Sequence, residues 1–238
     1  MTIYIQIDSN NMPLFDTCQV IYEQACFNNY NYNLIKLHDI SFIKYKHGDI
    51  IVGSVELTRA FIRKNIDRNF KFINTYPEEL KDYYYRDISK IKLKDYKGDS
   101  FIKPVDSKLF DGGFRDIYDI ELEMGAKIDE IGDTECYISS KIDIITEYRC
   151  FVYNNKLAGI HYYSGNPLNS ARFVDLVRII KGFKNAPIAY CLDIGVIDKG
   201  GNHKIAVIEV NDILASGTYG YSYKLINMYF DRFNEIRG

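Results

Sequence analysis

The sequence predicts a mixed α/β protein with two parts: a small open α/β unit and a more strand-rich α+β unit. Short apolar runs alternate with helical patterns over residues 2–65, which is typical of parallel strands joined by helices. Longer apolar strands joined by turn residues dominate residues 100–212. An amphipathic helix follows them over residues 221–236.

The first part reads strand–helix–strand, then strand–turn–helix. Apolar alternation predicts strands, and Asp16 and Ser54 stand where helix N-caps are expected. Gly53 marks the turn between the last strand and its helix. The expected strands are residues 2–7, 32–37 and 49–53, and the expected helices are residues 16–29 and 54–65.

The second part follows a charged, irregular segment, residues 76–100, which we interpret as a connection. Asn154 and Asn155 predict a hairpin turn, because asparagine tolerates a positive φ. The expected elements are a strand over residues 100–105, a glycine-bearing loop over 107–114, two or three strands over 135–165, a helix over 169–183, and an antiparallel pair over 188–197 and 203–212.

Composition excludes several function classes. The net charge of −2 gives no basic field for nucleic acid or for an anionic membrane. No apolar stretch approaches the roughly 20 residues that span a bilayer, and the start of the chain has no signal-peptide pattern. The five scattered cysteines are typical of a reducing compartment, so we expect a cytoplasmic protein with no membrane or nucleic-acid partner.

Two polar side chains interrupt the apolar run that ends at Asp212. Glu209 and Asn211 point to one face of the expected strand, and Asp193 can face them across the hairpin. Two carboxylates and an amide suit a hard cation such as Mg²⁺. The same residues also fit plainer structural roles: a strand with one solvated face, a surface lysine at Lys103, a surface pair of Arg149 with Glu147 or Asp143, and a turn cap at Asp193.

Six segments in a fixed order resemble the ATP-grasp superfamily. They are FIKP (101–104), SKLFDGGF (107–114), YISSK (137–141), EYRCFVYNNKLAGIHYY (147–163), LDIGV (192–196) and IEVND (208–212). The first part is similar, more loosely, to the small domain that precedes the grasp in compact members with unassigned substrates. The resemblance implies a pre-ATP-grasp α/β domain with its connector over residues 1–98. It also implies an ATP-grasp domain over residues 99–238, whose two α+β subdomains grip ATP between them.

The resemblance also implies roles for individual residues. Lys103 would hold the phosphates and Arg149 would stabilise the transferred phosphoryl group, so these two are the expected catalytic residues. The other expected ATP contacts are Ile138, Ser139, Ser140, Lys141, Glu147 and His161. The expected Mg²⁺ ligands are Asp193, Glu209 and Asn211. The segment DILASGTYG, residues 212–220, departs from the proline-bearing segment of many members, which leaves the acceptor open.

The implied activity is an ATP- and Mg²⁺-dependent carboxylate–amine (or –thiol) ligase that works through an acyl phosphate and releases ADP and phosphate. The acceptor is a small molecule, a peptide or a protein. Two alternatives use the same scaffold: an ATP-binding module without ligase activity, and a kinase that phosphorylates a hydroxyl group.

Overall fold

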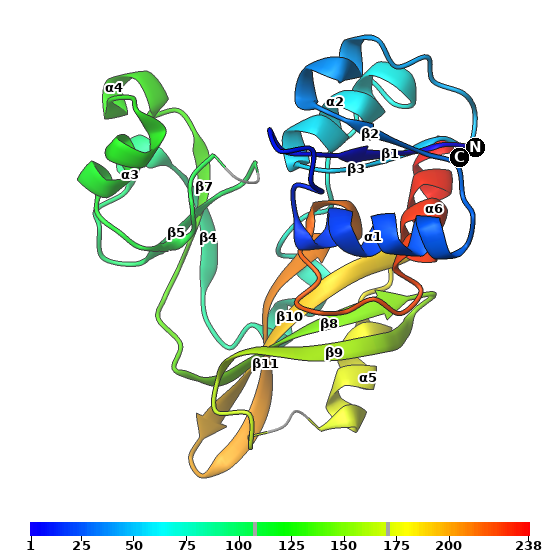
Figure 1. The fold of residues 1–238 in the computed structure, drawn as a ribbon. Helices are drawn as coiled ribbons and strands as arrows, with labels where there is room; N and C mark the ends of the chain where they lie inside the picture. Colours follow the sequence, from blue (N-terminus) through cyan, green and yellow to red (C-terminus); the bar gives the residue numbers. More distant parts are fainter. Residues whose placement is uncertain (107–108, 170–171) are drawn as a thin grey trace. The chain divides into compact units, whose positions relative to one another are not determined.

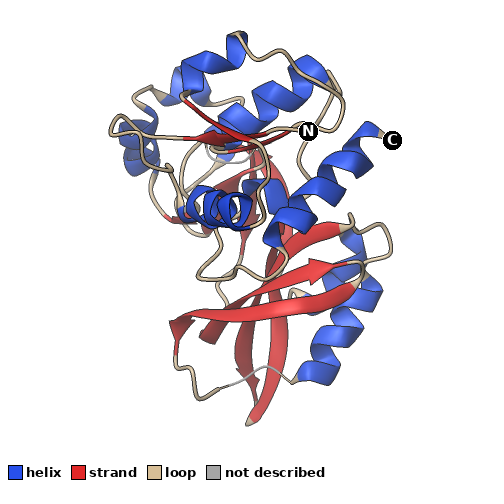
Figure 2. Cartoon of the chain, turned by 45° about the vertical axis from the view of Figure 1, so that its right-hand side comes forward, coloured by secondary structure: helices blue, strands red, loops and turns tan. Residues whose placement is uncertain are grey.

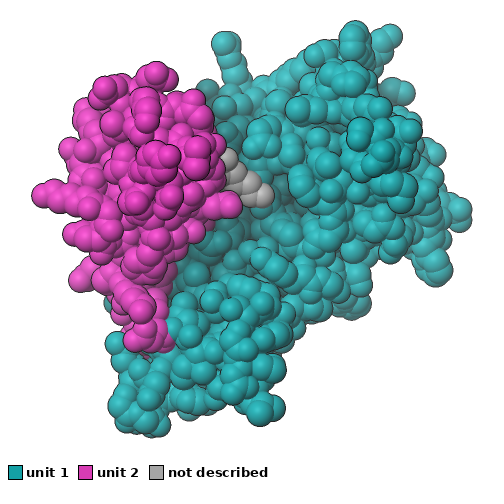
Figure 3. Space-filling view, turned by 60° about the vertical axis from the view of Figure 1, so that its left-hand side comes forward, with its two compact units in different colours: residues 1–83, 144–238 teal, residues 84–143 magenta. Residues whose placement is uncertain are grey.

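The computed structural model describes residues 1–106, 109–169 and 172–238. The chain forms two compact units, coloured separately in Figure 3. Unit 1 contains Met1–Tyr83 and Ile144–Gly238, and unit 2 contains Tyr84–Asp143. The expected domain boundary between residues 98 and 99 is a different kind of division and stays a prediction.

Unit 1 begins with a three-stranded parallel sheet, as the alternating pattern predicted. Its strands, in the order β2-β1-β3, are β1 (Ile3–Gln6), β2 (Tyr32–Ile35) and β3 (Ile50–Val52). The connecting helices α1 (Asp16–Phe27) and α2 (Val55–Asn65) lie on opposite faces of the sheet (Figure 1). All residues of β1 and β3 are buried, because helices cover both faces of this sheet.

The turn from β3 into α2 is tightly packed. The Ser54 side chain accepts a hydrogen bond from the Leu57 N–H at 3.2 Å and caps the helix. The Ser54 N–H donates to Gln6 Oε1 at 2.6 Å. A Cβ atom on Gly53 would lie 2.4 Å from Gln6 Oε1 and 2.7 Å from a Leu57 methyl carbon. Only glycine therefore fits at the turn that the sequence predicted.

We expect Gly53→Ala to lower the free energy of unfolding by about 1–3 kcal/mol, because the added methyl overpacks a closed turn. Urea unfolding followed by circular dichroism measures this change. Gly182→Ala is the matched control, since its Cβ would meet neighbours only at 3.9 Å. Equal midpoints for the two variants would contradict the packing argument.

A second, larger sheet of unit 1 is antiparallel, with the order β11-β10-β8-β9. Its strands are β8 (Ile144–Tyr153), β9 (Lys156–Gly165), β10 (Ala189–Lys199) and β11 (Asn202–Asp212). These long strands are visible in Figure 2. The two expected hairpins are confirmed.

Turn residues and one helix complete this sheet. Asn154 and Asn155 have φ of 52° and 56°, as the hairpin prediction required. Helix α5 (Phe173–Gly182) packs through Leu176, Ile179 and Ile180 beside the sheet. It begins later than the expected helix over residues 169–183, whose residues 170–171 lie outside the described part of the chain.

The core of unit 1 joins both sheets. Helix α6 (Leu225–Arg237) contributes Met228, Tyr229 and Phe233 to the same apolar cluster as β1, β3 and α1. Phe151 of β8 and Cys191 of β10 belong to this cluster as well. One face of the large sheet is therefore anchored, at one end, in the core of the N-terminal sheet.

Unit 2 contains a four-stranded antiparallel sheet with the order β4-β7-β5-β6. The strands are β4 (Ile88–Lys92), β5 (Phe101–Pro104), β6 (Gly113–Phe114) and β7 (Glu135–Ser139). Strand β4 corrects our interpretation of residues 76–100 as an irregular connection. Its sequence ISKIK is half-exposed and carries two lysines, so it lacks the apolar character of a buried strand.

Two helices cover one face of the unit 2 sheet. Helices α3 (Ile117–Met124) and α4 (Ile128–Ile131) pack against alternate strand residues that include Ile102, Cys136 and Ile138. Asp116 caps α3 by accepting from the Asp119 N–H at 2.9 Å. Residues between these alternate positions must point to the other face of the sheet.

The helices of the described residues are short. The longest, α6, has 13 residues. No helix in the described part of the chain is long and apolar enough to cross a membrane.

Candidate active site

The polar residues of the large sheet meet on one face of unit 1. Arg149 of β8, Asp193 of β10 and Glu209 of β11 lie opposite one another in consecutive strand pairs. Asn211 lies two residues beyond Glu209 and therefore points to the same face. The register skips Ile208, so a β-bulge lies directly beside Asp193 and Glu209. The structure brings these four side chains together, and we call them the polar cluster.

Arg149 and Asp193 form a buried two-point ion pair. Arg149 Nε donates to Asp193 Oδ1 at 2.7 Å, and Arg149 Nη2 donates to Asp193 Oδ2 at 2.6 Å. The residues are only 8% and 2% exposed. Burial by itself lowers the pKa of the Arg149 guanidinium, but the hydrogen bonds and charge of Asp193 outweigh it, so the net shift is upward. Arg149 is therefore held charged and fixed in orientation by Asp193, not by Glu147 as the plainer alternative had it.

Asn211 connects the two carboxylates of the polar cluster. Its Nδ2 donates to Glu209 Oε1 at 2.6 Å and lies 3.4 Å from Asp193 Oδ2. Accepting two bonds from Arg149 uses only part of the roughly four acceptor positions of a carboxylate. Two carboxylates and an amide in mutual contact match the oxygen ligands that Mg²⁺ prefers. The donor set therefore fits a hard divalent cation.

Unit 2 presents a second polar face. Lys103 of β5 and Lys90 of β4 are both in register with Tyr137 of β7, so the three residues point to the same face of the sheet. That face is the one opposite α3 and α4. Lys90 Nζ lies 5.1 Å from the centre of the Tyr137 ring. A Cβ on Gly112 would lie 3.3 Å from the Lys103 Cβ, which places part of the glycine-bearing loop beside Lys103.

The other expected nucleotide contacts have defined surroundings. Ile138 and Ser139 end β7, and the Ser140 N–H donates to the Asp87 carbonyl at 3.3 Å. The exposed Lys141 Nζ lies 3.6 Å from Asp143 Oδ1. Their contacts with adenine or phosphate stay predictions. In the expected loop over residues 107–114, residues 107–108 lie outside the described part of the chain.

Glu147 and His161 are the remaining expected contacts, and both belong to unit 1. Glu147 Oε2 accepts a 2.8 Å hydrogen bond from the Tyr163 hydroxyl. Burial, then the charges of Asp193 and Glu147, raise the pKa of Tyr163, so its hydroxyl stays protonated. His161 lies opposite Arg149 in β9, with Nδ1 3.1 Å from the Tyr219 carbonyl oxygen. Both residues therefore adjoin the polar cluster.

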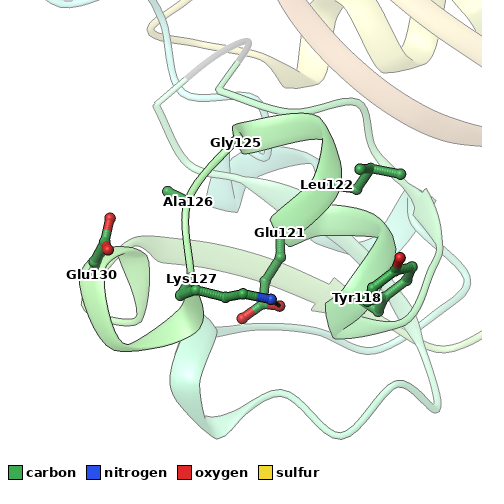
Figure 4. A pocket seen from close by; sticks show the side chains of 7 residues that line it. All are labelled: Tyr118, Glu121, Leu122, Gly125, Ala126, Lys127 and Glu130. Carbon is green, nitrogen blue, oxygen red and sulfur yellow. Dashed lines mark hydrogen bonds and ion pairs between the residues drawn. The ribbon is translucent and has the colours of Figure 1, made fainter.

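A hollow on unit 2 lies apart from all these residues. It has a volume of about 320 Å³ and is lined by α3, α4 and their connection (Figure 4). Tyr118 and Leu122 contribute exposed apolar surface to it. The Lys127 Nζ that lines it already pairs with Glu121 Oε2 at 2.9 Å. No expected site residue lines this hollow, so it has no part in the candidate site.

Comparison with known protein families accounts for this arrangement. A family model described as an ATP-grasp domain, the second family of its clade, matches residues 83–227. The chain belongs to this family. No match was found among the curated proteins. The matched residues of this ATP-grasp domain include every expected ATP and metal contact, from Lys103 to Asn211.

Solved structures share the fold of this ATP-grasp protein at low sequence identity. A D-alanine–D-alanine ligase from Bacillus anthracis is 12% identical over 99% of this chain and 97% of its own, with a TM-score of 0.54. A RimK domain ATP-grasp protein from Sphaerobacter thermophilus is 11% identical over 100% and 98%, with a TM-score of 0.54. The macrocyclase MdnC from Microcystis aeruginosa, bound to precursor peptide MdnA, is 8% identical over 97% and 98%, with a TM-score of 0.51. These similarities show that the mixed α+β chain has the ATP-grasp fold.

Three residues that adjoin the candidate site of the ATP-grasp domain were not expected from the sequence. Lys90 lies in the strand that we missed, and Tyr219 covers the Arg149 guanidinium at 4.7 Å. Asp16 was expected only as a helix cap, yet it binds residues that follow 202 positions later in the sequence. No short-range pattern joins segments so far apart, so the sequence carried no signal for this contact.

Proposed function

We propose that the chain is an ATP- and Mg²⁺-dependent ligase that joins a carboxylate to an amine or a thiol through an acyl phosphate. The polar cluster carries this proposal, because it combines a fixed buried cation with two carboxylates and an amide on one sheet face. Membership of the ATP-grasp family supports the use of ATP. The acceptor stays open, and the peptide bound to the macrocyclase MdnC makes peptides one class to test.

The proposed roles follow the chemistry of the side chains. Lys103 and Lys90 would bind phosphate oxygens of ATP, and residues 138–141 and Glu147 would contact adenine and ribose. Asp193, Glu209 and Asn211 would hold Mg²⁺, which when bound would neutralise charge on the phosphates. Bonds among the described residues engage three of the five N–H donors of Arg149. The other donors of this fixed guanidinium suit the developing charge on a transferred phosphoryl group.

The proposed reaction has two bond exchanges. A carboxylate oxygen of the substrate attacks the γ-phosphorus of ATP, the bond from that phosphorus to the β–γ bridging oxygen breaks, and ADP leaves. The amine or thiol then attacks the acyl carbon, the bond to the phosphate oxygen breaks, and the nucleophile loses its proton. The protein's part is to position the reactants and stabilise charge, so no covalent bond to a side chain is required.

A titration with a non-hydrolysable ATP analogue tests the nucleotide site. We expect micromolar affinity in the presence of Mg²⁺ and weaker affinity without it, measured by calorimetry. No binding at millimolar analogue, in a sample whose circular dichroism shows a folded protein, would contradict the proposal. With candidate acceptors, release of ADP and free phosphate supports a ligase. A phosphorylated product without free phosphate would indicate the kinase, and binding without ADP release from any acceptor would indicate the binding module.

We expect Lys103→Met to weaken binding of the ATP analogue about 10- to 100-fold, as expected for the loss of a charge-assisted hydrogen bond worth about 1.5–3 kcal/mol. The same calorimetric titration measures it. Lys94→Met is the control, because Lys94 is an exposed lysine of the same unit that pairs with Asp133. A Kd for Lys103→Met equal to that of the control would remove Lys103 from the nucleotide site.

A further inference from the structure

The chain segment that follows β11 contacts the Arg149 guanidinium twice. Arg149 Nη1 donates to the Gly217 carbonyl at 3.0 Å, and the Tyr219 ring lies 4.7 Å from Arg149 Cζ. Together with Asp193, these contacts hold the guanidinium at its edge and at its face. We call residues 216–219 the clamp loop.

The clamp loop is bound by the first residue of α1. Asp16 Oδ2 accepts from the Thr218 N–H at 2.8 Å, from Thr218 Oγ1 at 2.7 Å and from the Tyr219 N–H at 3.3 Å. Thr17 Oγ1 donates to the Ser216 carbonyl at 3.1 Å. Thr218 is only 1% exposed, so these bonds are shielded from competing water.

The charge state of Asp16 favours this arrangement. Burial raises its pKa, but the hydrogen bonds from Thr218 and Thr17 outweigh burial, and the net shift is downward. The carboxylate is thus ionised at neutral pH and accepts every bond described above. An amide in its place would turn one donor group toward donors, which would break part of the set.

Tyr219 is held in an uncommon backbone conformation. Its φ is 46°, in the left-handed region that a bulky residue seldom adopts. Its N–H is bound to Asp16, its carbonyl oxygen lies 3.1 Å from His161 Nδ1, and its ring stacks on Tyr163 at 5.0 Å. Such a conformation persists only where the surroundings impose it, and it is found most often at functional sites.

We infer that Asp16 is a positioning residue, which fixes the clamp loop and through it orients Arg149 for phosphoryl transfer. The inference rests on the proposed function, since it is there that Arg149 touches the reacting group. Asp16 itself contacts neither the nucleotide nor the metal ligands in this assignment. It acts only through Thr218, Gly217 and Tyr219, so its loss should slow the reaction without weakening nucleotide binding.

The test compares Asp16→Asn with Asp8→Asn. Asp8 is the matched control, because it lies in the same β1–α1 connection and accepts only local N–H bonds, from Asn10 and Met12. For Asp16→Asn we expect faster hydrogen exchange at the Thr218 and Tyr219 amides. We also expect Mg²⁺-dependent ADP release without acceptor to fall about 10- to 100-fold, since a small misplacement of a catalytic group has effects of this size. The Kd for the ATP analogue should stay within about twofold. Asp8→Asn should match wild type.

Substitutions at Thr218 keep the inference testable if Asp16→Asn fails to fold. Thr218→Val removes the 2.7 Å bond to Asp16 and should reduce ADP release, whereas Thr218→Ser keeps the hydroxyl and should restore it. ADP release from Asp16→Asn and Thr218→Val at the wild-type rate overturns the positioning role alone. No ADP release from wild type overturns the proposed function and, with it, this role.

Discussion

Replacing Glu209 by glutamine should reduce Mg²⁺-dependent ADP release about 100- to 1,000-fold while leaving the fold intact. The substitution removes one carboxylate charge from the proposed metal ligands, and several kcal/mol of charge stabilisation are lost with it. It keeps an oxygen that can accept the 2.6 Å bond from Asn211, so the strand pair should persist. A magnesium titration of ADP release at saturating ATP measures the effect, and circular dichroism measures the fold.

Asp198→Asn is the matched control for Glu209→Gln. It removes a carboxylate from the same β10–β11 hairpin, at the turn, where Asp198 accepts from the Gly201 N–H at 2.8 Å. We expect its magnesium dependence to match wild type. If Glu209→Gln responds to magnesium as this control does, Glu209 is not a metal ligand, and the polar face of β11 has only a structural role.

Replacing Arg149 by methionine should lower the free energy of unfolding by about 3–5 kcal/mol, because Asp193 then stays buried without its partner. Urea unfolding at pH 7 measures this loss. The unpaired carboxylate should have a raised pKa in the folded variant. A raised folded-state pKa destabilises the charged form, so the deficit should shrink as the pH falls and grow as it rises.

Two comparisons separate this effect from a general loss of charge. Arg178→Met breaks the exposed pair with Asp175 and should cost under about 1 kcal/mol. The double variant Arg149→Met/Asp193→Leu removes both charges and should recover most of the stability, but not ADP release. A single Arg149→Met variant as stable as Arg178→Met would mean that Asp193 is compensated by other groups.

The sequence was sufficient to predict the hairpin on which the candidate site is built. The apolar run on both sides of Gly200 and Gly201 predicted β10 and β11, and the strand period of two then placed Asp193, Glu209 and Asn211 on one face. Resemblance to the ATP-grasp superfamily selected these residues from others of the same type, and the family match over residues 83–227 confirmed the membership.

Interactions between distant segments could not be predicted in this way. The ion pair of Arg149 with Asp193 depends on which strand lies beside β8, and strand order is not written in local alternation. Strand β4 was missed because lysines occupy its exposed positions. The contact of Asp16 with Thr218 requires the finished tertiary structure, since 202 residues separate them.

The shared core of unit 1 has a consequence for biosynthesis. Met228, Tyr229 and Phe233 of α6 bury the same apolar cluster as β1, β3 and α1, which are made long before them. A nascent chain that has emerged only as far as residue 220 has its first sheet formed in sequence but not covered by α6. Folding of this unit therefore depends on contacts of large sequence separation, and such contacts form slowly. Apolar surface of the first sheet stays exposed during translation, when chaperones would bind it.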